Sequence, residues 1–170
     1  MFLKEDEICA RTQKLGEQIT ESFKALGSRK PLLVVGVLNG SFVFMADLIR
    51  SISIDCEIDF IQLSSYEGTS SSGKVVMKKD FSYSIEGRDV LLVEDIVDTG
   101  LSMNFLLEKM RSQGASSVKL CSLLSKPSRR EVEVKIDYLG FEIEDHFVVG
   151  YGLDYEGRYR QLKDIVVYSE

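Results

Sequence analysis

The stretch Val90-Leu-Leu-Val-Glu-Asp-Ile-Val-Asp-Thr-Gly-Leu-Ser102 joins an apolar strand pattern to a polar turn. Its apolar part, residues 90–93, is followed by the carboxylates Glu94, Asp95 and Asp98 and then by an amphipathic helical pattern. This order predicts a strand, a turn and a helix. Crowded carboxylates need cations or hydroxyl groups as neighbours, because an unpaired buried charge is costly. The glycine turn behind them offers backbone N–H groups to an anion. The stretch therefore suggests a site for a sugar phosphate bound with a metal.

The composition is typical of one soluble globular domain. The chain has 170 residues, of which 44% are hydrophobic and 28% are charged, and this length can bury a sizeable core. The net charge of −6 argues against a general nucleic-acid binder, although Lys126, Arg129 and Arg130 form a local basic patch. No apolar run approaches the ~20 residues of a membrane span, and residues 1–15 lack the apolar part of a signal peptide. We therefore expect a cytoplasmic protein that binds neither nucleic acid nor membranes.

The cysteines and the histidine argue against several kinds of site. Cys9, Cys56 and Cys121 are far apart and form no C-x-x-C pair, so we interpret them as reduced, buried thiols. His146 is the only histidine, which argues against a multi-histidine zinc site and against a Ser–His catalytic pair.

Apolar periodicity predicts helices that alternate with strands. Helical spacing covers residues 8–26 and 101–113, each followed by a glycine. The apolar run 32–38 predicts a strand buried on both faces, followed by a turn at Asn39-Gly40 and a short helix capped by Ser41. Further strands are expected around 58–60 and at 75–77, 90–93, 118–124, 136–141, 147–149 and 165–168.

This alternation predicts an α/β fold with a Rossmann-like, mostly parallel sheet flanked by helices. In such sheets, ligands bind beyond the carboxyl ends of the strands. Polar turns at 39–41, 94–102 and 126–127 follow predicted strands and should meet at that edge. The polar segment 64–74 is too long for a tight turn, so we expect a mobile loop there.

Five spaced motifs resemble those of one enzyme family. Residues 93–102 resemble the phosphoribosyl pyrophosphate signature of type I phosphoribosyltransferases. Residues 36–42, 63–66, 124–127 and 147–155 resemble the pyrophosphate loop, mobile lid, purine-reading turn and carboxyl-terminal segment of its hypoxanthine-guanine branch. The resemblance implies a single domain over 1–170, with a core at about 30–126, a small hood from the N-terminal segment and about 127–170, and a lid at about 64–76.

The resemblance gives the acids and the turn separate roles. The family's acid pair, matched by Glu94 and Asp95, binds the ribose 2′- and 3′-hydroxyl groups. From the residues alone, these acids could also cap the turn or pair with a lysine. Ser102 stands where the family often has threonine, which keeps the hydroxyl group. The implied 5′-phosphate loop, with its hydroxyl and N–H groups, comprises Thr99, Gly100, Leu101 and Ser102.

Asp98 matches the family's acid beside purine N7. There it would take or give the N7 proton as N9 attacks the anomeric carbon. The alternative is an ordinary turn aspartate. Two further acids nearby should raise its proton affinity, to an extent set by the cations that neutralise the site. Asp98 is therefore the candidate catalytic residue.

A third set of residues matches the family's pyrophosphate site. The backbone of Leu38, Asn39 and Gly40 would face the pyrophosphate, and Arg160 would grip its oxygens with a planar fork. Related enzymes often have a basic residue in place of Asn39, and the family has a non-proline cis peptide in this loop, which a sequence does not reveal. The resemblance also implies Mg²⁺, held by Glu94, Asp95 and Asp154.

The implied purine site includes one cation. Lys126 would donate to purine O6, which favours 6-oxopurines over adenine because an ammonium group only donates; the alternative is a solvated loop lysine. Phe147 would stack on the base, with packing in the core as an equal alternative. The remaining candidates are the backbones of Val148 and Leu153 and the carboxylate of Asp154.

These features lead to one hypothesis and its rivals. The hypothesis is an enzyme that binds phosphoribosyl pyrophosphate, a 6-oxopurine base and Mg²⁺, works as a homodimer or homotetramer, and closes a lid that begins at Ser65 and Tyr66. Without the resemblance, that lid is equally a disordered surface loop. A regulatory protein that keeps the site as a sensor would need an extra domain or a broad basic face, and neither is apparent. A dinucleotide-binding domain would need G-x-G-x-x-G after a strand, and none is present.

Overall fold

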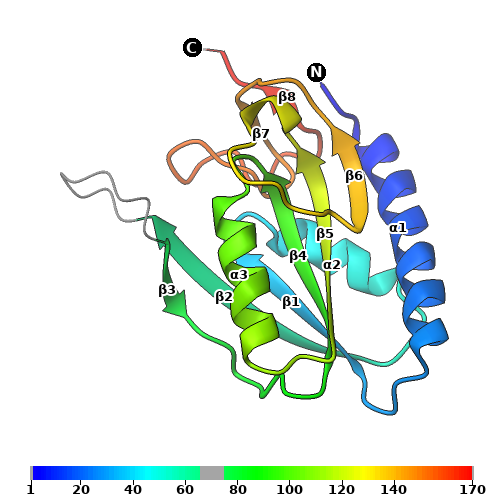
Figure 1. Ribbon diagram of the computed structural model, residues 1–170. Coiled ribbons are helices and arrows are strands. Elements are labelled where there is room, and N and C mark those ends of the chain that lie inside the picture. The colour runs from blue at the N-terminus through cyan, green and yellow to red at the C-terminus, as the bar shows by residue number, and fades with distance from the viewer. Residues whose placement is uncertain (1, 66–74, 170) are drawn as a thin grey trace.

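A six-stranded sheet forms the centre of the protein in the computed structural model, which describes residues 2–65 and 75–169 (Figure 1). The strand order is β3-β2-β1-β4-β5-β6, and every neighbouring pair is parallel except β2 and β3. The predicted fold class is therefore confirmed. The elements in chain order are α1 (Glu5–Leu26), β1 (Leu32–Leu38), α2 (Phe42–Arg50), β2 (Cys56–Ser65), β3 (Val75–Lys79), β4 (Asp89–Val97), α3 (Leu101–Ser112), β5 (Ser117–Ser125), the 3-10 helix η1 (Pro127–Arg129), β6 (Tyr138–Glu142), β7 (Val148–Val149) and β8 (Val166–Val167).

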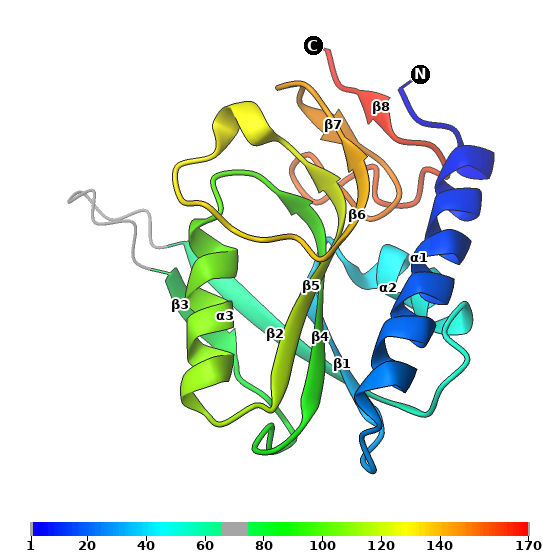
Figure 2. The same ribbon diagram turned by 45° about the vertical axis from the view of Figure 1, so that its right-hand side comes forward.

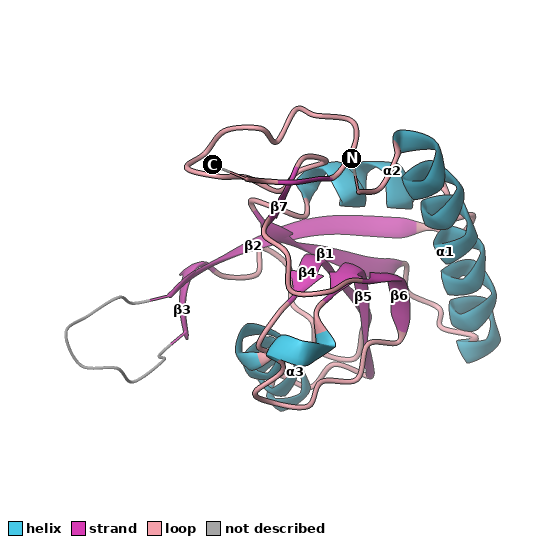
Figure 3. Ribbon diagram, turned by 90° about the horizontal axis from the view of Figure 1, so that it is seen from above, coloured by secondary structure: helices cyan, strands magenta, loops and turns pink. Residues whose placement is uncertain are grey.

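Helices cover both faces of this sheet. Figure 3 shows α1 and α2 on one face and α3 on the other. Alternate residues of β4 point into the two apolar layers that result: Leu91 and Val93 pack on the α1 and α2 side, and Val90 and Leu92 pack on the α3 side. Burial on both faces explains why β1 and the start of β4 are continuous apolar runs.

A separate two-stranded sheet, β7 paired with β8, lies beyond the carboxyl ends of β4 and β5 (Figure 1). The N-terminal residues are hydrogen-bonded to the residue just before β8, because Leu3 and Ile165 exchange backbone hydrogen bonds of 3.0 and 2.9 Å. Figure 2 shows the two ends of the chain next to each other above α1. Both ends of the sequence thus meet near the edge where the polar turns are expected.

Three local expectations were wrong in whole or in part. Strand β4 does not stop at Val93 but continues through both acids to Val97, because Glu94 and Ile96 still pair with β5. Ser41 is the N-cap residue of α2 as expected, but its side chain makes no capping hydrogen bond, because its hydroxyl group donates to the Val37 carbonyl at 2.6 Å. Cys9 is exposed rather than buried.

Within the described residues, no helix has the length and apolarity to cross a membrane.

Candidate active site

The acid pair of β4 lies where the strand reaches the carboxyl edge of the sheet. Glu94 lines a pocket together with Thr99, Gly100 and Ser102. Asp95 lies against Gly40 in the loop after β1, so close that a Cβ atom on Gly40 would collide with the Asp95 carboxylate. Neighbouring strand residues point to opposite faces, and the two acids therefore reach different turns of the same edge.

Both acids are in an environment that disfavours their charged forms. Burial, followed by the charge of Asp95, raises the pKa of Glu94 well above its usual range. Burial also raises the pKa of Asp95 to about 6, although its own backbone hydrogen bonds and the Arg160 guanidinium oppose the shift. The Glu94 Oε2 atom is buried and has no hydrogen-bond partner among the described residues. A ligand that brings donors or positive charge would satisfy this pair.

The turn between β4 and α3 leaves backbone N–H groups open to an anion. Gly100, with a φ of 87°, is the residue before α3 and has no side chain to cap this 12-residue helix. In the first turn, the Leu101 N–H donates to the Thr99 hydroxyl group at 3.4 Å. The loop after η1 holds the turn in place, because the Thr99 carbonyl accepts hydrogen bonds from Glu131 and Val132 at 2.9 and 3.1 Å. A Cβ atom on Gly100 would strike the Val132 carbonyl. Glycine is therefore required here by both conformation and space.

Asp98 and Lys126 follow adjacent strands and lie at the same edge. The Lys126 N–H donates to the Val97 carbonyl at 3.0 Å, which places the lysine beside the end of β4. Lys126 is buried, with 8% exposure, so it is not a solvated loop lysine. Asp98 is half-exposed and forms an ion pair with Arg129 at 3.3 Å. Asp98 lines the same pocket as Glu94 and its carboxylate contacts a cation, so the expected effect of the neighbouring acids on its proton affinity stays a prediction.

Arg130 supports the same turn. Its guanidinium donates to the Asp98 carbonyl at 2.9 Å and to the Ser125 hydroxyl group at 2.7 Å. It thus ties the ends of β4 and β5 together. The sequence analysis placed Arg130 only in a local basic patch.

The loop after β1 meets the carboxyl-terminal segment. The Leu38–Asn39 peptide is cis. A Cβ atom on Gly152 would collide with the Gly40 carbonyl, so the two backbones are in close contact. Arg160 donates to the Gly152 carbonyl at 2.5 Å and pairs with Asp154 at 2.7 Å. Gly152, for which the sequence analysis had no role, joins the two segments.

Aromatic rings surround the segment expected to bind the base. Phe147 has 52% exposure and is not a core residue. Its ring makes edge-to-face contacts with the rings of Tyr155 and Tyr168, with ring centroids 5.8 and 6.0 Å apart. Val148 and Leu153 are buried, and the N–H and carbonyl groups of Leu153 bond to the backbone of Gly150. Tyr155 lies in the 147–155 motif and Tyr168 in the strand expected at 165–168, but neither ring was given a role, because ring contacts between distant segments leave no local pattern.

Three comparisons with known proteins agree with this geometry. A phosphoribosyl transferase domain model matches residues 3–156. The chain belongs to the phosphoribosyltransferase family. A hypoxanthine-guanine phosphoribosyltransferase of Bacillus subtilis is 45% identical over 168 residues, covering 98% of this chain and 91% of the relative. A hypoxanthine phosphoribosyltransferase of Escherichia coli K12 is 47% identical over 163 residues, covering 95% and 90%. The hypoxanthine phosphoribosyltransferase of Trypanosoma cruzi in complex with the product IMP has a TM-score of 0.92 and 42% identity, covering 98% and 92%.

The metal ligands expected for this phosphoribosyltransferase form no complete cage. Among residues 2–65 and 75–169, no group of three or more His, Cys, Asp or Glu side chains is placed to hold a metal ion. Magnesium sites usually use one or two carboxylates together with substrate phosphates. Glu94 and Asp95 fit such a shared site, because Glu94 Oε2 lacks a partner and both carboxyl groups are short of positive charge. Asp154 is already paired with Arg160.

The lid residues are only partly within the described chain. Ser65 ends β2 and its backbone pairs with Val75 of β3. Tyr66 lies outside the described residues, as does the segment up to residue 74.

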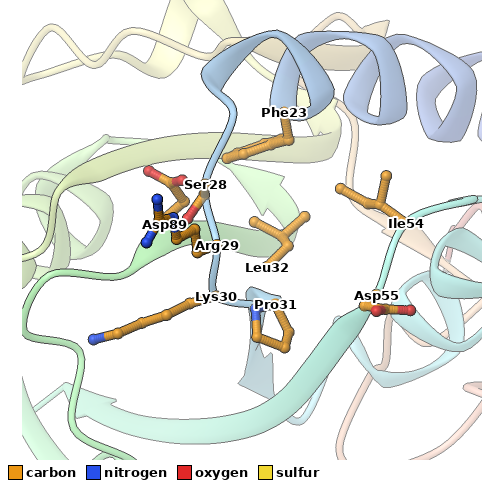
Figure 4. Close-up of a pocket in the computed structure, with 9 residues that line it drawn as sticks. All are labelled: Phe23, Ser28, Arg29, Lys30, Pro31, Leu32, Ile54, Asp55 and Asp89. Atoms are coloured by element: carbon orange, nitrogen blue, oxygen red, sulfur yellow. The ribbon is translucent and has the colours of Figure 1, made fainter.

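A cavity of about 220 Å³ lies at the opposite edge of this phosphoribosyltransferase, near the amino ends of β1 and β4 (Figure 4). Phe23, Arg29, Lys30, Asp55 and Asp89 are among the residues that line it. None of its lining residues was predicted to bind substrate. The carboxyl edge therefore stays the candidate active site.

Proposed function

We propose that this protein transfers the 5-phosphoribosyl group from phosphoribosyl pyrophosphate to N9 of hypoxanthine or guanine, giving IMP or GMP and pyrophosphate. The observation that carries the proposal is the buried Lys126, held beside the end of β4 by its backbone bond to Val97. Its ammonium group can donate to O6 of a 6-oxopurine but has no acceptor for the amino group of adenine. A purine salvage activity follows from this donor next to the phosphoribosyl motif.

The turn after β4 would bind the rest of the donor substrate. The N–H groups of the first turn of α3 and the hydroxyl groups of Thr99 and Ser102 would hold the 5′-phosphate. Glu94 and Asp95 would accept hydrogen bonds from the ribose hydroxyl groups, which would supply Glu94 Oε2 with the donor it lacks. Arg160 and the backbone at Leu38, Asn39 and Gly40 would face the pyrophosphate.

Asp98 would handle the proton of the base. N9 attacks the anomeric carbon of the ribose while the bond to pyrophosphate breaks, and the purine must lose one proton in the process. The Asp98 carboxylate is half-exposed at the end of β4, between the phosphate turn and Lys126, so it can accept that proton from N7. Phe147 would stack on the base, and the Val148 and Leu153 backbones would read its edge. Because the Leu153 N–H already donates to Gly150, Leu153 would contribute the second lone pair of its carbonyl.

Magnesium fits the same site. We assign Glu94 and Asp95 as its carboxylates, with Asp154 nearby, and the ion would neutralise charge on the departing pyrophosphate when bound. We further propose that residues 64–76 close over the reacting centre to exclude water, that the enzyme works in the cytoplasm, and that it assembles as a homodimer or homotetramer.

A panel of bases tests the activity. The protein is incubated with phosphoribosyl pyrophosphate, Mg²⁺ and each of hypoxanthine, guanine, xanthine and adenine, and nucleotide formation is followed by absorbance. We expect product from hypoxanthine or guanine and little from adenine. The absence of product with every base would overturn the proposed activity. Product chiefly from adenine would overturn the role of Lys126.

A further inference from the structure

Four side chains form a row of alternating charge that begins at Lys126 and ends at Asp98. Lys126 Nζ lies 3.3 Å from Asp145 Oδ1, and the other carboxylate oxygen of Asp145 lies 3.8 Å from Arg129 Nη1. Arg129 Nε in turn lies 3.3 Å from Asp98 Oδ1. These residues come from the end of β5, the turn η1, the loop between β6 and β7, and the end of β4. The order of charges along the row is plus, minus, plus, minus.

Asp145 is the member that joins the two cations. Among the described residues, its carboxylate accepts a hydrogen bond from the buried Lys126 ammonium group, and it also pairs with the guanidinium of Arg129. A buried ammonium group needs such a partner, because an unpaired one is costly. Losing the Asp145 charge would leave the Lys126 ammonium without this partner and would leave Arg129 paired with Asp98 alone.

The planar guanidinium group of Arg129 can fix the position of Asp98 relative to Asp145. A guanidinium group is planar and rigid, so it can contact one carboxylate through Nε and another through Nη1 without bending. Arg129 makes this pair of contacts with Asp98 and Asp145. Its backbone N–H also donates to the Lys126 carbonyl at 3.1 Å, which fixes its place relative to the lysine. Side chain and backbone together join the two ends of the row.

Purine O6 and N7 lie next to each other on one edge of the base. Two protein groups that contact both atoms must keep a fixed spacing, and a misplacement of about 1 Å costs up to about a hundredfold in rate. We propose that Asp145 and Arg129 are positioning residues that hold Lys126 and Asp98 at the spacing of O6 and N7. This inference rests on the proposed function, since it needs Lys126 and Asp98 to contact the base.

Steady-state kinetics of single and double variants test the row. Asp145→Asn and Arg129→Gln keep the approximate shape and remove one charge each. For each we expect KM for hypoxanthine to rise about tenfold or more, while KM for phosphoribosyl pyrophosphate changes less than about twofold. The double variant should lose no more than the more affected single variant, because the residues act through one connected row. Asp145→Glu, which keeps the charge, should recover part of the loss.

Glu144→Gln is the matched control. Glu144 is adjacent in sequence, 89% exposed, and paired with His146 at 3.3 Å outside the row. We expect its KM values to match those of the unchanged protein. Arg129→Lys provides a second variant that keeps the charge but loses the planar fork, and it should behave like Arg129→Gln.

Several outcomes would overturn the inference. Equal increases in both KM values would indicate general structural damage, and strictly additive losses would show that the two residues act separately. Unchanged hypoxanthine KM in Asp145→Asn and Arg129→Gln would remove their positioning role. If the unchanged protein forms nucleotide and the variants give any of these results, the inference is overturned and the proposed function stands. If the unchanged protein is inactive with every base, the proposed function itself is overturned.

Discussion

The three acids at the end of β4 have three different environments. Glu94 shares a pocket with the turn at residues 99–102, Asp95 lies against Gly40, and Asp98 is half-exposed beside Arg129. Asp98 also lines the pocket of Glu94, and its carboxylate is paired with the Arg129 guanidinium. The proposed roles, ligand binding by Glu94 and Asp95 and proton transfer by Asp98, rest on these different contacts.

Replacing Asp98 by Asn tests that division. The amide keeps the shape of the side chain but does not accept a proton as a carboxylate does. We expect kcat to fall by about 10²–10⁴, with the dissociation constant of phosphoribosyl pyrophosphate changed by less than a few-fold. Single-turnover kinetics and equilibrium binding measure the two quantities. Turnover close to that of the unchanged protein would exclude Asp98 as the group that moves the proton.

Asp95 makes the stability of the ligand-free protein depend on pH. Burial raises its pKa from 3.8 to about 6, so the folded protein binds this proton more tightly than the unfolded chain. The free energy of unfolding should therefore fall as pH rises from about 4 to about 6, by on the order of 3 kcal/mol from this residue. Asp95→Asn should weaken that decline, with Glu94 keeping a decline of its own.

Urea unfolding across about pH 4 to pH 7 measures the effect. The difference between Asp95→Asn and the unchanged protein isolates Asp95, because hydrogen bonds lower the pKa of Asp59 and Asp80 and give the opposite slope in both proteins. Parallel curves for the two proteins would show that Asp95 has the same pKa folded and unfolded.

At the scale of elements, apolar periodicity predicted most of the sheet and both long helices. The strand predicted at 32–38 agrees with β1, and Gly27 ends α1 as expected. The continuation of β4 through Glu94 and Asp95 was missed because a strand of acids looks like a turn unless the pairing partner β5 is known. The ion pairs of Arg129 and Asp145 were missed for a similar reason, since contacts between distant loops leave no local pattern.

The contact between Gly152 and the loop after β1 gives an element-scale prediction. Gly152 has a φ of 100°, and a Cβ atom there would strike the Gly40 carbonyl. Gly152→Ala should therefore push away the loop after β1, which we propose faces the pyrophosphate, and raise KM for phosphoribosyl pyrophosphate. It should also lower the free energy of unfolding by more than the roughly 1–2 kcal/mol that left-handed backbone alone costs. Kinetics and urea unfolding measure both effects.

Gly157→Ala is the control for this substitution. Gly157 lies in the same segment with a φ of 79°, but nothing lies within 4 Å of an added Cβ atom. It should show the backbone cost and an unchanged KM. If both variants change KM alike, the effect of Gly152 comes from backbone strain and not from the contact with Gly40.

At the scale of the whole molecule, the sheet separates two apolar layers and also joins them. Leu91 and Leu92 are neighbours on β4, each fully buried, yet they pack on opposite faces. A substitution that disturbs the packing of either layer therefore also disturbs β4. The strand also ends in the acids of the candidate site, so the stability of both layers bears on the position of Glu94 and Asp95.

This arrangement predicts one cooperative unfolding transition. Leu91→Ala and Leu92→Ala should each lower the free energy of unfolding by about 2–5 kcal/mol, the usual cost of emptying a buried leucine site. In both variants, urea curves from far-ultraviolet circular dichroism and from tyrosine fluorescence should coincide, with the slope of the unchanged protein. Phosphoribosyl pyrophosphate with Mg²⁺ should raise the midpoint of all three proteins, because the ligand binds only the folded state. Separate transitions in Leu92→Ala alone would show that the α3 layer unfolds independently, and the strand they share would then not couple the layers.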